Sequence, residues 1–539
     1  MKTPMSQLPG VSALVSDYFD NFEKVAEFYN GDYRTPENFL HRSADIKTRD
    51  LPLGKLVPIL KEQNQKYGCG LATLEKIDWL LERRACAVVT GQQTGLFGGP
   101  LLTIYKALTA IKLAARLSRT CEGCYVPIFW LASDDHDFRE VNHIYFQDKS
   151  NAPAKLTYKA NPAASRIPVS QIKLTEEIQA LLTELDAATH PSEFKERVLA
   201  ELADAYSAGT SFSDAFGKWL MALLKPFGLV IIDASDARIK TLGAALFEKE
   251  ILEASPSTQQ AIAASKKLVQ RNYHNQVQLT NGFLNLFYAE EERNSIQMEN
   301  GKFIIKNSGK SLQREELQKK LHEHPEHFSP NVLLRPLFQD ALLPTIAYVA
   351  GPAEAAYYAQ MKGIYAAFDI PMPIIYPRKS LTLREPRIEK VLDNYGLKVE
   401  DFWGNVETLI TRIARAQLPG QLEKKIEHTR LNLETNLKRL EDVIAEFDPT
   451  LVDFVKSTRG RFENQLQGLE KKILQAFKKR NDVIRQQLYK AHNSLYPNNH
   501  LQERELNIVP YLFKHGFNFI DQLYEAMDVS SFEHQIVRI

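Results

Sequence analysis

The sequence has few of the features that mark several classes of protein. Only 4 of its 539 residues are cysteine, too few for a secreted disulfide scaffold, which favours a reducing compartment. Its 67 Lys and Arg residues nearly balance 66 Asp and Glu residues, for a net charge of +1, so no overall field attracts nucleic acid or an anionic membrane. The first residues lack the apolar segment and small-residue cleavage site of a signal peptide. We therefore expect a cytoplasmic protein that binds small molecules and neither nucleic acid nor membrane.

Membrane-spanning and metal-binding patterns are also weak. One uncharged stretch, Ala85 to Tyr105, is long enough to cross a bilayer, but its glycines and Pro100 would make a poor lipid-exposed helix. Cys121 and Cys124 form a C-x-x-C that no second pair or spaced histidine pair follows. We interpret them as two reduced thiols, and we assign no side chain of this chain as a metal ligand.

Apolar runs alternate with helical patterns along the first part of the chain. A run from Ala85 to Thr90 ends in a glycine turn, a helical pattern covers Leu101 to Leu117, and a second run covers Tyr125 to Ala132. This order predicts a β-α-β unit. Further apolar runs at 229–233, 345–350 and 372–376 predict an open α/β sheet assembled from distant segments.

Two later segments have patterns of their own. Between Gln278 and Lys306, short alternating strands are separated by Asn-Gly dipeptides, which predicts a small β-rich insertion. From Leu422 to Leu488, apolar residues recur every three or four positions and are interrupted at Asp448-Pro449. Asp suits an N-cap and Pro the first helical position, so two long helices in an antiparallel coiled-coil hairpin are predicted. So long an arm favours a partner, most simply a second copy of the chain.

The first candidate site is the glycine-rich turn between Thr90 and Pro100. It follows a strand and opens a helix, where free backbone N–H groups and the helix dipole favour a phosphate. It matches neither a P-loop nor the dinucleotide fingerprint. A tight turn in which glycine serves packing is the alternative, but Gln92 and Gln93 at a strand's carboxyl end favour a ligand.

The second candidate is the acidic sequence that begins at Ser133 and continues through Asp134, Asp135, His136 and Asp137. Its carboxylates repel one another unless a cation, an amine or hydrogen-bond donors compensate. We interpret it as a site for an ammonium group, for the Mg²⁺ that accompanies ATP, or for a general base. A solvated helix N-terminus would account for only one of the acids.

Arginine marks three further candidates. Arg335 lies in apolar surroundings, where a guanidinium needs an anionic ligand or a carboxylate such as Asp340 or Glu354. Arg378 follows an apolar strand and could hold phosphates, or could belong to a surface turn. Arg504 is spaced to share one helix face with two polar residues at positions 507 and 511, either as a nucleotide cradle or as a contact between domains.

Six sequence blocks occur in a specific order: V-V-T-G-Q-Q-T-G-L-F-G-G-P-L-L-T-I-Y-K at 88–106, I-F-W-L-A-S-D-D-H-D-F at 128–138, E-H-P-E-H-F-S-P-N-V-L-L-R-P-L-F-Q at 323–339, A-G-P-A-E at 350–354, P-R-K-S-L-T-L at 377–383 and E-R-E-L-N-I-V-P-Y-L at 503–512. Together they resemble the cysteine ligase (cysteine-adding enzyme) family of bacillithiol biosynthesis, and the resemblance covers essentially the whole chain.

The resemblance implies a Rossmann-like core similar to class I aminoacyl-tRNA synthetase and nucleotidyltransferase folds. A connecting-peptide insertion and a coiled-coil domain used for dimerisation accompany that core. The implied reaction joins the carboxyl group of cysteine to the amine of glucosaminyl-malate in the last step of bacillithiol biosynthesis. ATP, or ADP or another nucleotide, with Mg²⁺, is the expected cofactor. The alternatives are another ATP-dependent acyl or nucleotidyl transferase on the same fold, and a nucleotide-binding coiled-coil scaffold.

Residue roles follow from the resemblance as hypotheses. The expected catalytic residues are Asp134, Asp135, His136 and Asp137. The expected substrate-binding residues are Gln92, Gln93, Asn142, His143, Asn331, Arg335, Gln339 and Glu354. The expected nucleotide-binding residues are Thr94, Gly95, Gly98, Gly99, Lys106, Arg378, Ser380, Thr382, Arg504, Asn507 and Tyr511. The glycine turn lacks the H-x-G-H histidines, and 378–380 only loosely imitates the K-M-S-K-S loop of the synthetases.

The same hypothesis divides the chain into five segments. They are the first part of the core at 1–150, a helical and β-rich connecting-peptide insertion at 151–330 interleaved with a core strand near 229–233, the last part of the core at 331–395, the helical coiled-coil hairpin at 396–500 and a C-terminal helical cap at 501–539.

Overall fold

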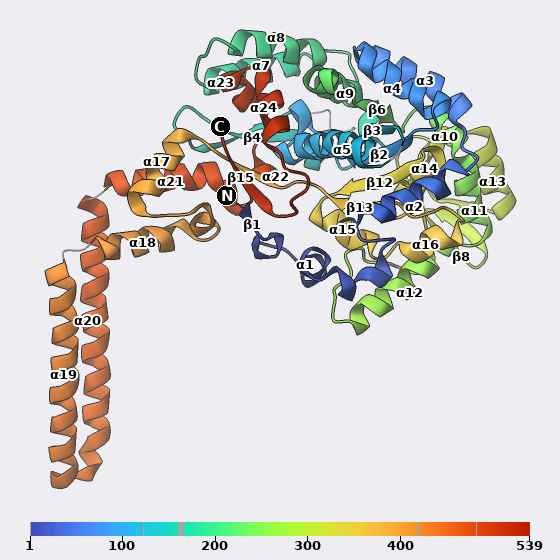
Figure 1. Cartoon of the computed structure of the whole chain (residues 1–539). Coiled ribbons are helices and arrows are strands. Elements are labelled where there is room, and N and C mark those ends of the chain that lie inside the picture. Colours follow the sequence, from blue (N-terminus) through green and yellow to red (C-terminus); the bar gives the residue numbers. More distant parts are fainter. Residues whose placement is uncertain (1, 122, 160–166, 418–419, 481) are drawn as a thin grey trace. The chain divides into compact units, whose positions relative to one another are not determined.

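The computed structural model describes residues 2–121, 123–159, 167–417, 420–480 and 482–539 (Figure 1). The chain forms two compact units. The first comprises Met1–Thr382 and Gln502–Val537, and the second comprises Leu383–Leu501 and Arg538–Ile539.

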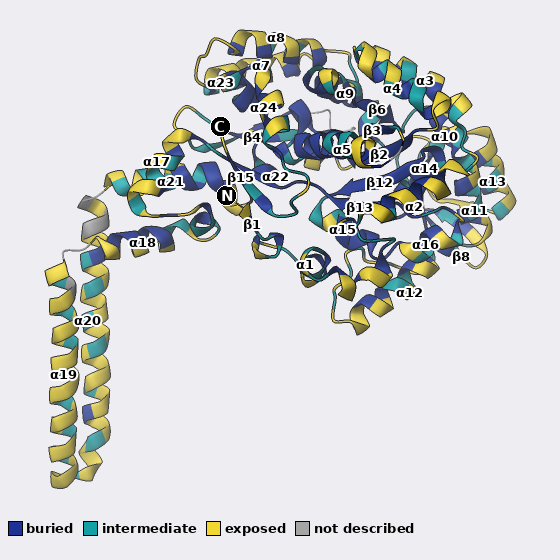
Figure 2. Cartoon of the chain, in the orientation of Figure 1, coloured by how far each residue is buried: buried dark blue, intermediate teal, exposed yellow. Residues whose placement is uncertain are grey.

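A five-stranded parallel sheet forms the centre of the first unit, with strand order β13-β12-β2-β3-β6. Its strands are β2 (Cys86–Gln92), β3 (Tyr125–Leu131), β6 (Val230–Asp233), β12 (Thr345–Ala350) and β13 (Ile374–Pro377). The predicted open α/β sheet is therefore confirmed strand by strand. These runs are apolar because helices cover both faces of a parallel sheet, and nearly all of their residues are buried (Figure 2).

Helices surround this sheet and complete the first unit (Figure 1). The crossover from β2 to β3 is α5 (Leu101–Thr120), as predicted. The other helices are α1 (Ala13–Asp20), α2 (Pro36–Lys47), α3 (Leu53–Lys66), α4 (Leu71–Glu82), α6 (Phe138–Val141), α7 (Glu177–Ala188), α8 (Lys195–Ala205), α9 (Phe212–Leu224), α10 (Ala237–Leu242), α11 (Ala244–Leu252), α12 (Pro256–Gln270), α13 (Arg314–Glu323), α14 (Arg335–Leu342), α15 (Pro352–Tyr358), α16 (Lys362–Ala367), α22 (Gln502–Glu505), α23 (Val509–His515) and α24 (Asn518–Ala526).

The predicted β-rich insertion is a second five-stranded sheet, antiparallel throughout, with order β10-β9-β8-β7-β11. Its strands are β7 (Phe283–Tyr288), β8 (Asn294–Glu299), β9 (Lys302–Ile305), β10 (Lys310–Leu312) and β11 (Phe328–Pro330). Asn300 and Gly301, both at positive φ, join β8 to β9, which is the two-residue turn that an Asn-Gly dipeptide favours.

The C-terminal segment differs from the predicted helical cap. After α24 the chain forms β15 (His534–Arg538), which pairs antiparallel with β1 (Lys2–Thr3). The β-branched Ile536 and Val537 are buried in β15. Residues of this type are more favourable in a strand than in a helix, because they pack well on a pleated surface. The remaining short strands are β4 (His143–Gln147), β5 (Pro153–Thr157) and β14 (Leu381–Arg384).

The second unit is helical and contains the predicted coiled-coil hairpin, formed by α19 (Gly420–Phe447) and α20 (Val452–Arg480). Asp448 caps the turn by accepting a hydrogen bond from the Thr450 N–H at 2.9 Å. An ion pair of 2.8 Å between Arg430 and Glu470 links the two helices. The second predicted helix corresponds to α20 and α21 (Asp482–Leu495), between which residue 481 lies outside the described residues. The other helices are α17 (Pro386–Tyr395) and α18 (Val406–Ala416).

Among the helices that the structure describes, none combines the length and the apolar character that crossing a lipid bilayer requires.

Candidate active site at the carboxyl edge of the parallel sheet

A cavity of about 650 Å³ opens in the first unit where the parallel strands end. The chain runs from β2 to β3 on one side of β2, whereas β12 arrives much later on its other side. The strand order therefore reverses at β2, and ligands of open α/β sheets bind at such a switch point. The carboxyl ends of β2, β3 and β12 line the cavity together with α14, α15 and the β-rich insertion.

The acidic residues after β3 form one end of this cavity. The Lys240 Nζ lies 2.6 Å from Asp134 Oδ2 and also donates to the Phe328 carbonyl at 3.0 Å. Lys240 is only 1% exposed, and burial lowers the pKa of its ammonium group while the charge of Asp134 raises it. The sequence indicated that a cation or other donors must compensate these acids, and the structure shows that Lys240 is this cation for Asp134.

Asp135 has its own set of donors. The Gln93 Nε2 donates to Asp135 Oδ2 at 2.8 Å, and the Arg293 Nη1 lies 3.5 Å from Asp135 Oδ1. Burial by itself would raise the pKa of Asp135, but the hydrogen bond from Gln93 and the charge of Arg293 outweigh it and lower the pKa below the usual value. Asp135 is thus held in its ionised form.

Arg293, which comes from the β-rich insertion, also contacts His136 and favours one tautomer of its ring. Its guanidinium lies 3.7 Å from the centre of the Phe287 ring, and its Nη1 is 3.2 Å from His136 Nδ1. Because a guanidinium has no acceptor, His136 Nδ1 must accept this bond, and the neutral imidazole then carries its proton on Nε2. In this arrangement His136 offers a donor to the cavity.

Lys106 and Glu354 form a buried ion pair of 2.5 Å on another wall. The Lys106 Nζ donates in addition to the Gly91 carbonyl at 2.6 Å and to Gln92 Oε1 at 3.1 Å. Glu354 accepts hydrogen bonds from the Gly351 N–H and the Tyr348 hydroxyl, each at 2.7 Å. Both charges are satisfied by the protein itself, so Lys106 supports the end of β2 rather than offering a free cation.

Arg335 has no such partner. Its Nη2 donates to the Tyr357 hydroxyl at 3.0 Å and the Tyr348 hydroxyl at 3.3 Å, whereas its Nη1 is enclosed and has no hydrogen-bond partner among the described residues. Neither Asp340 nor Glu354 forms an ion pair with it in the described part of the chain. Of the alternatives that the sequence left open, the structure therefore favours an anionic ligand, because a desolvated guanidinium is costly unless it is paired.

Arg378 is paired inside the protein. Its two terminal nitrogens lie 3.0 and 2.6 Å from the Glu503 carboxylate oxygens, and both side chains are 2% exposed. Glu503 also accepts from the Ser380 hydroxyl at 2.9 Å, and both Ser380 and Thr382 hydrogen-bond to the His534 ring. The expected phosphate loop is thus a buried polar network, of which only Arg378 reaches the cavity wall.

The later part of the glycine turn, residues 94–99, is held by packing and does not line the cavity. The Asn507 Nδ2 donates to the Phe97 carbonyl at 3.0 Å and the Gly99 carbonyl at 2.6 Å, and a Cβ on Gly98 would lie 3.1 Å from the Trp219 ring. The Leu101 N–H at the start of α5 is already bonded, to the Leu506 carbonyl at 2.8 Å. The expectation of free N–H groups for a phosphate is wrong at this position.

The expected shared face at the C-terminus is also wrong. Asn507 lies between α22 and α23, and its Oδ1 accepts the Val509 N–H at 2.8 Å, which caps α23 instead of continuing α22. Tyr511 stacks on Phe519 with ring centres 5.8 Å apart. Only Arg504 of the three residues lines the cavity.

The structure brings about half of the candidate residues together. Those lining the cavity are Gln92, Gln93, Lys106, Asp134, Asp135, His136, Asn331, Arg335, Glu354, Arg378 and Arg504. Those placed elsewhere are Thr94, Gly95, Gly98, Gly99, Asp137, Asn142, His143, Gln339, Ser380, Thr382, Asn507 and Tyr511. Asp137 is exposed, and Gln339 is fully buried with its Nε2 bonded to Asp340 at 2.9 Å.

Sequence reasoning missed Lys240, Arg293, Tyr348 and Tyr357. Lys240 and Arg293 lie far along the chain from the acids that they neutralise, and no local pattern marks them. The two tyrosines lie beside the A-G-P-A-E block. This block predicted a turn, but it gave no sign that neighbouring hydroxyls bind Arg335.

The expected nucleotide does not match this cavity well. Most residues expected to hold its phosphates lie outside the cavity, and Lys106 and Arg378 are already neutralised by Glu354 and Glu503. Four negative charges of a triphosphate would therefore meet few uncommitted cations.

Fold and cavity together define a Rossmann-like α/β protein with a small-molecule pocket at a strand-order switch and a separate helical coiled-coil unit. Comparison with known families agrees: residues 1–379 match the model described as "Bacillithiol biosynthesis BshC, N-terminal Rossmann-like domain", and residues 381–539 match "Bacillithiol biosynthesis BshC, C-terminal coiled-coil domain". The chain belongs to the BshC family of bacillithiol biosynthesis.

Curated relatives match over nearly the whole chain. A protein of Salinibacter ruber is 35% identical over 100% of this chain and 98% of its own length. A protein of Chloroherpeton thalassium is 33% identical over 98% of this chain and 96% of its own length. A protein of Koribacter versatilis is 31% identical over 99% of this chain and 99% of its own length. All three are named "Putative cysteine ligase BshC". The family resemblance found in the sequence, with its Rossmann-like core and coiled coil, is thus confirmed.

Proposed function

We propose that this protein is a ligase that joins the carboxyl group of L-cysteine to the amine of glucosaminyl-malate. The names of the relatives support a cysteine ligase. The observation that carries the proposal is Arg335, a guanidinium at the cavity wall with an unpartnered nitrogen and no ion pair to a carboxylate among the described residues. A dicarboxylate such as a malate group supplies the missing partner.

Arg335 is oriented for a carboxylate. The Tyr348 and Tyr357 hydroxyls accept from its Nη2; Nη1 has no partner among the described residues, and a carboxylate that binds there has to displace the atoms that enclose it. Hydrogen bonds between a guanidinium and a carboxylate are among the strong ones, and they gain strength where water is excluded.

The acidic end of the cavity suits the amine of the same substrate. β3, which leads into Asp134 and Asp135, and β12, which bears Tyr348, flank β2 in the sheet. Two strand spacings, roughly 10 Å, therefore separate the ends, and one aminosugar with an acidic substituent can bridge them. In this proposal the ionised Asp135 orients the amine and accepts its proton as the new carbon–nitrogen bond forms.

Activation of cysteine is a separate part of the proposal. Joining a carboxylate to an amine is uphill in water, so an activated carboxyl group is required. ATP with Mg²⁺ remains our proposed co-substrate, although most of the residues expected for its phosphates lie outside the cavity.

Product formation tests the proposal. Purified protein incubated with cysteine, glucosaminyl-malate and ATP should yield bacillithiol, detected by mass spectrometry. Absence of the product with every nucleoside triphosphate would count against the ligase. A product formed only with another amine would favour a different acyl transferase on this fold.

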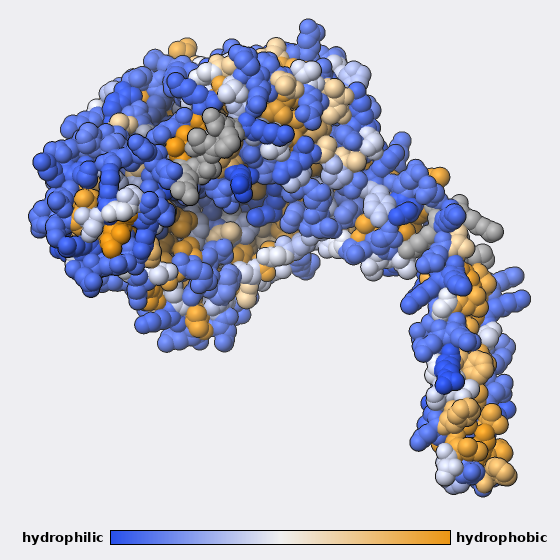
Figure 3. Space-filling view, turned by 180° about the vertical axis from the view of Figure 1, so that it is seen from behind, coloured by the Kyte–Doolittle hydropathy of each residue, from blue (hydrophilic) through white to orange (hydrophobic). Residues whose placement is uncertain are grey.

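We also propose that the coiled-coil unit forms a homodimer. Large apolar side chains remain exposed along the hairpin: Leu431 is 53% exposed, Val443 63%, Phe447 84% and Phe454 66%. Figure 3 shows such side chains gathered along the hairpin. Exposed apolar patches of this kind mark protein interfaces, and a second hairpin offers a matching surface.

A further inference from the structure

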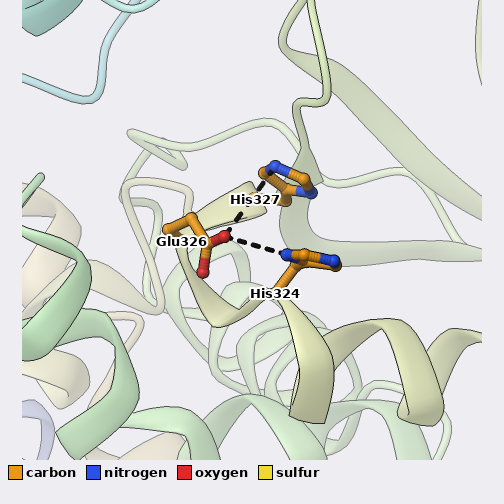
Figure 4. A group of neighbouring side chains, drawn as sticks. All are labelled: His324, Glu326 and His327. Atoms are coloured by element: carbon orange, nitrogen blue, oxygen red, sulfur yellow. Dashed lines mark hydrogen bonds and ion pairs between the residues drawn. The ribbon is translucent and has the colours of Figure 1, made fainter.

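Outside the cavity, His324, Glu326 and His327 bring two imidazoles and a carboxylate together at one turn (Figure 4). The turn follows α13, which ends at Glu323, and leads directly into β11 at Phe328. The Glu326 Oε1 lies 3.0 Å from His324 Nδ1 and 4.0 Å from His327 Nε2. We propose that these three residues bind a zinc ion, with water as the fourth ligand.

The spacing fits tetrahedral coordination. Zinc binds histidine nitrogen at about 2.0–2.1 Å and carboxylate oxygen at about 2.0–2.2 Å, so neighbouring ligand atoms of a tetrahedral site lie about 3.4 Å apart. The two measured separations fall on either side of this value, and all three ligand atoms lie within 4.8 Å of one another.

A simple hydrogen bond explains only part of the arrangement. It accounts for His324, but 4.0 Å is too long for His327 to donate to Glu326. The His327 Nδ1 is enclosed with no hydrogen-bond partner among the described residues, so Nε2 is the nitrogen that this ring can offer to a ligand. The two rings are stacked, with centres 4.9 Å apart and planes 19° apart, so both present an edge to the same carboxylate.

The donor set selects the kind of ion. Two imidazole nitrogens and one carboxylate oxygen suit zinc and similar transition metals, whereas Mg²⁺ and Ca²⁺ prefer oxygen ligands alone. The sequence signal is the His-Pro-Glu-His run at 324–327, in the same block as the candidate residues Asn331, Arg335 and Gln339. This site is independent of the proposed ligase reaction.

The position of the site suggests what the ion does. The His327 carbonyl accepts the Ala289 N–H at 2.8 Å, and the next residue, Phe328, accepts from Lys240, the partner of Asp134. Zinc would therefore anchor the start of β11. The carbonyl of Phe328, the first residue of this strand, accepts a hydrogen bond from the Lys240 ammonium group at the acidic end of the cavity.

Zinc binding to the full-length, metal-depleted protein tests the proposal. We expect one zinc equivalent to be retained after dialysis, measured by elemental analysis, and we expect His324→Ala or His327→Ala to weaken that binding at least tenfold. The matched control is His322→Ala, because the exposure of His322 is similar to that of His324 and it pairs with Glu248 at 3.3 Å instead. Its zinc content should equal that of the unaltered protein.

Cobalt substitution identifies the ligands independently. A site of nitrogen and oxygen ligands gives only weak visible bands, whereas cysteine ligands add intense thiolate charge-transfer absorption. No bound zinc, equal binding by the His324→Ala/His327→Ala double variant, equal loss in His322→Ala, or thiolate absorption would each overturn the proposal. Ligase activity does not enter this test, so failure of the proposed reaction leaves it intact.

Discussion

Replacing Arg335 separates its proposed role in binding from any role in stability. We consider Arg335→Gln, which removes the charge but keeps a polar side chain of similar reach. If Nη1 holds a substrate carboxylate, the variant loses a charge-assisted hydrogen bond worth about 1.5–3 kcal/mol. The KM for glucosaminyl-malate should then rise roughly 10- to 150-fold, whereas the KM for cysteine should change little.

The free energy of unfolding of Arg335→Gln should not fall, although its substrate binding weakens. Arg335 has no carboxylate partner in the described protein, so removing its desolvated charge should leave stability unchanged or increase it. The matched control is Arg378→Gln, which breaks the buried pair with Glu503 and should cost about 3–5 kcal/mol. Urea unfolding measures both variants.

Two results would refute this reasoning. One is an unchanged KM for glucosaminyl-malate in Arg335→Gln under conditions in which the unaltered protein is active. The other is a loss of stability as large as that of Arg378→Gln, which would show that Arg335 holds the fold and not a ligand.

Four further predictions concern the cavity, the turn and the hairpin. Asp135→Asn should reduce product formation at least a hundredfold at neutral pH. Because the pKa of Asp135 is lowered, the activity of the unaltered protein should fall only below the pH at which an ordinary Asp titrates. Burial lowers the pKa of Lys379 to about 8, so the unfolded chain binds the extra proton between pH 8 and 10.5, and stability relative to Lys379→Met should rise with pH across that window. Asn507→Ala should destabilise the protein by about 1–3 kcal/mol, because the Phe97 carbonyl loses its side-chain donor. Phe447→Glu should shift the proposed dimer toward monomer in light scattering.

Each of these has an outcome that contradicts it. Full activity of Asp135→Asn would show that Asp135 is not the group that accepts the proton of the amine. A stability difference for Lys379→Met that does not change with pH would mean that its ammonium group is better solvated than the structure shows. An unaltered protein that is already monomeric would end the dimer proposal, and Asn507→Ala with unchanged stability would show that water replaces its amide.

Local patterns in the sequence predicted the elements of the fold well. Strands β2, β3 and β12 follow from short apolar runs ended by glycine or polar residues. The β8–β9 turn follows from Asn300-Gly301 and the hairpin turn from Asp448-Pro449. These signals are readable because turn, cap and strand preferences depend on residues within a few positions of one another.

Contacts between distant residues decided the chemistry of the cavity. The sequence showed that the acids after β3 need compensation, but only folding brings Lys240 and Arg293 to them. It also left open whether Arg335 pairs with the protein. The sequence favoured a phosphate site at the glycine turn, but the Leu506 carbonyl already accepts the Leu101 N–H, and Asn507, which is 408 positions from Gly99, packs its amide against the turn.

The sequence by itself thus determined the strands of the parallel sheet, the turns at Asn300-Gly301 and Asp448-Pro449, the helical hairpin and, through its blocks of residues, the family. Only the tertiary structure decided which charges are already neutralised and which, like Arg335, face the cavity unpaired. The physical reason is that secondary structure reflects short-range steric and hydrogen-bonding preferences, whereas the electrostatic state of a buried group depends on every charge and dipole within a few ångströms, whatever its position in the chain.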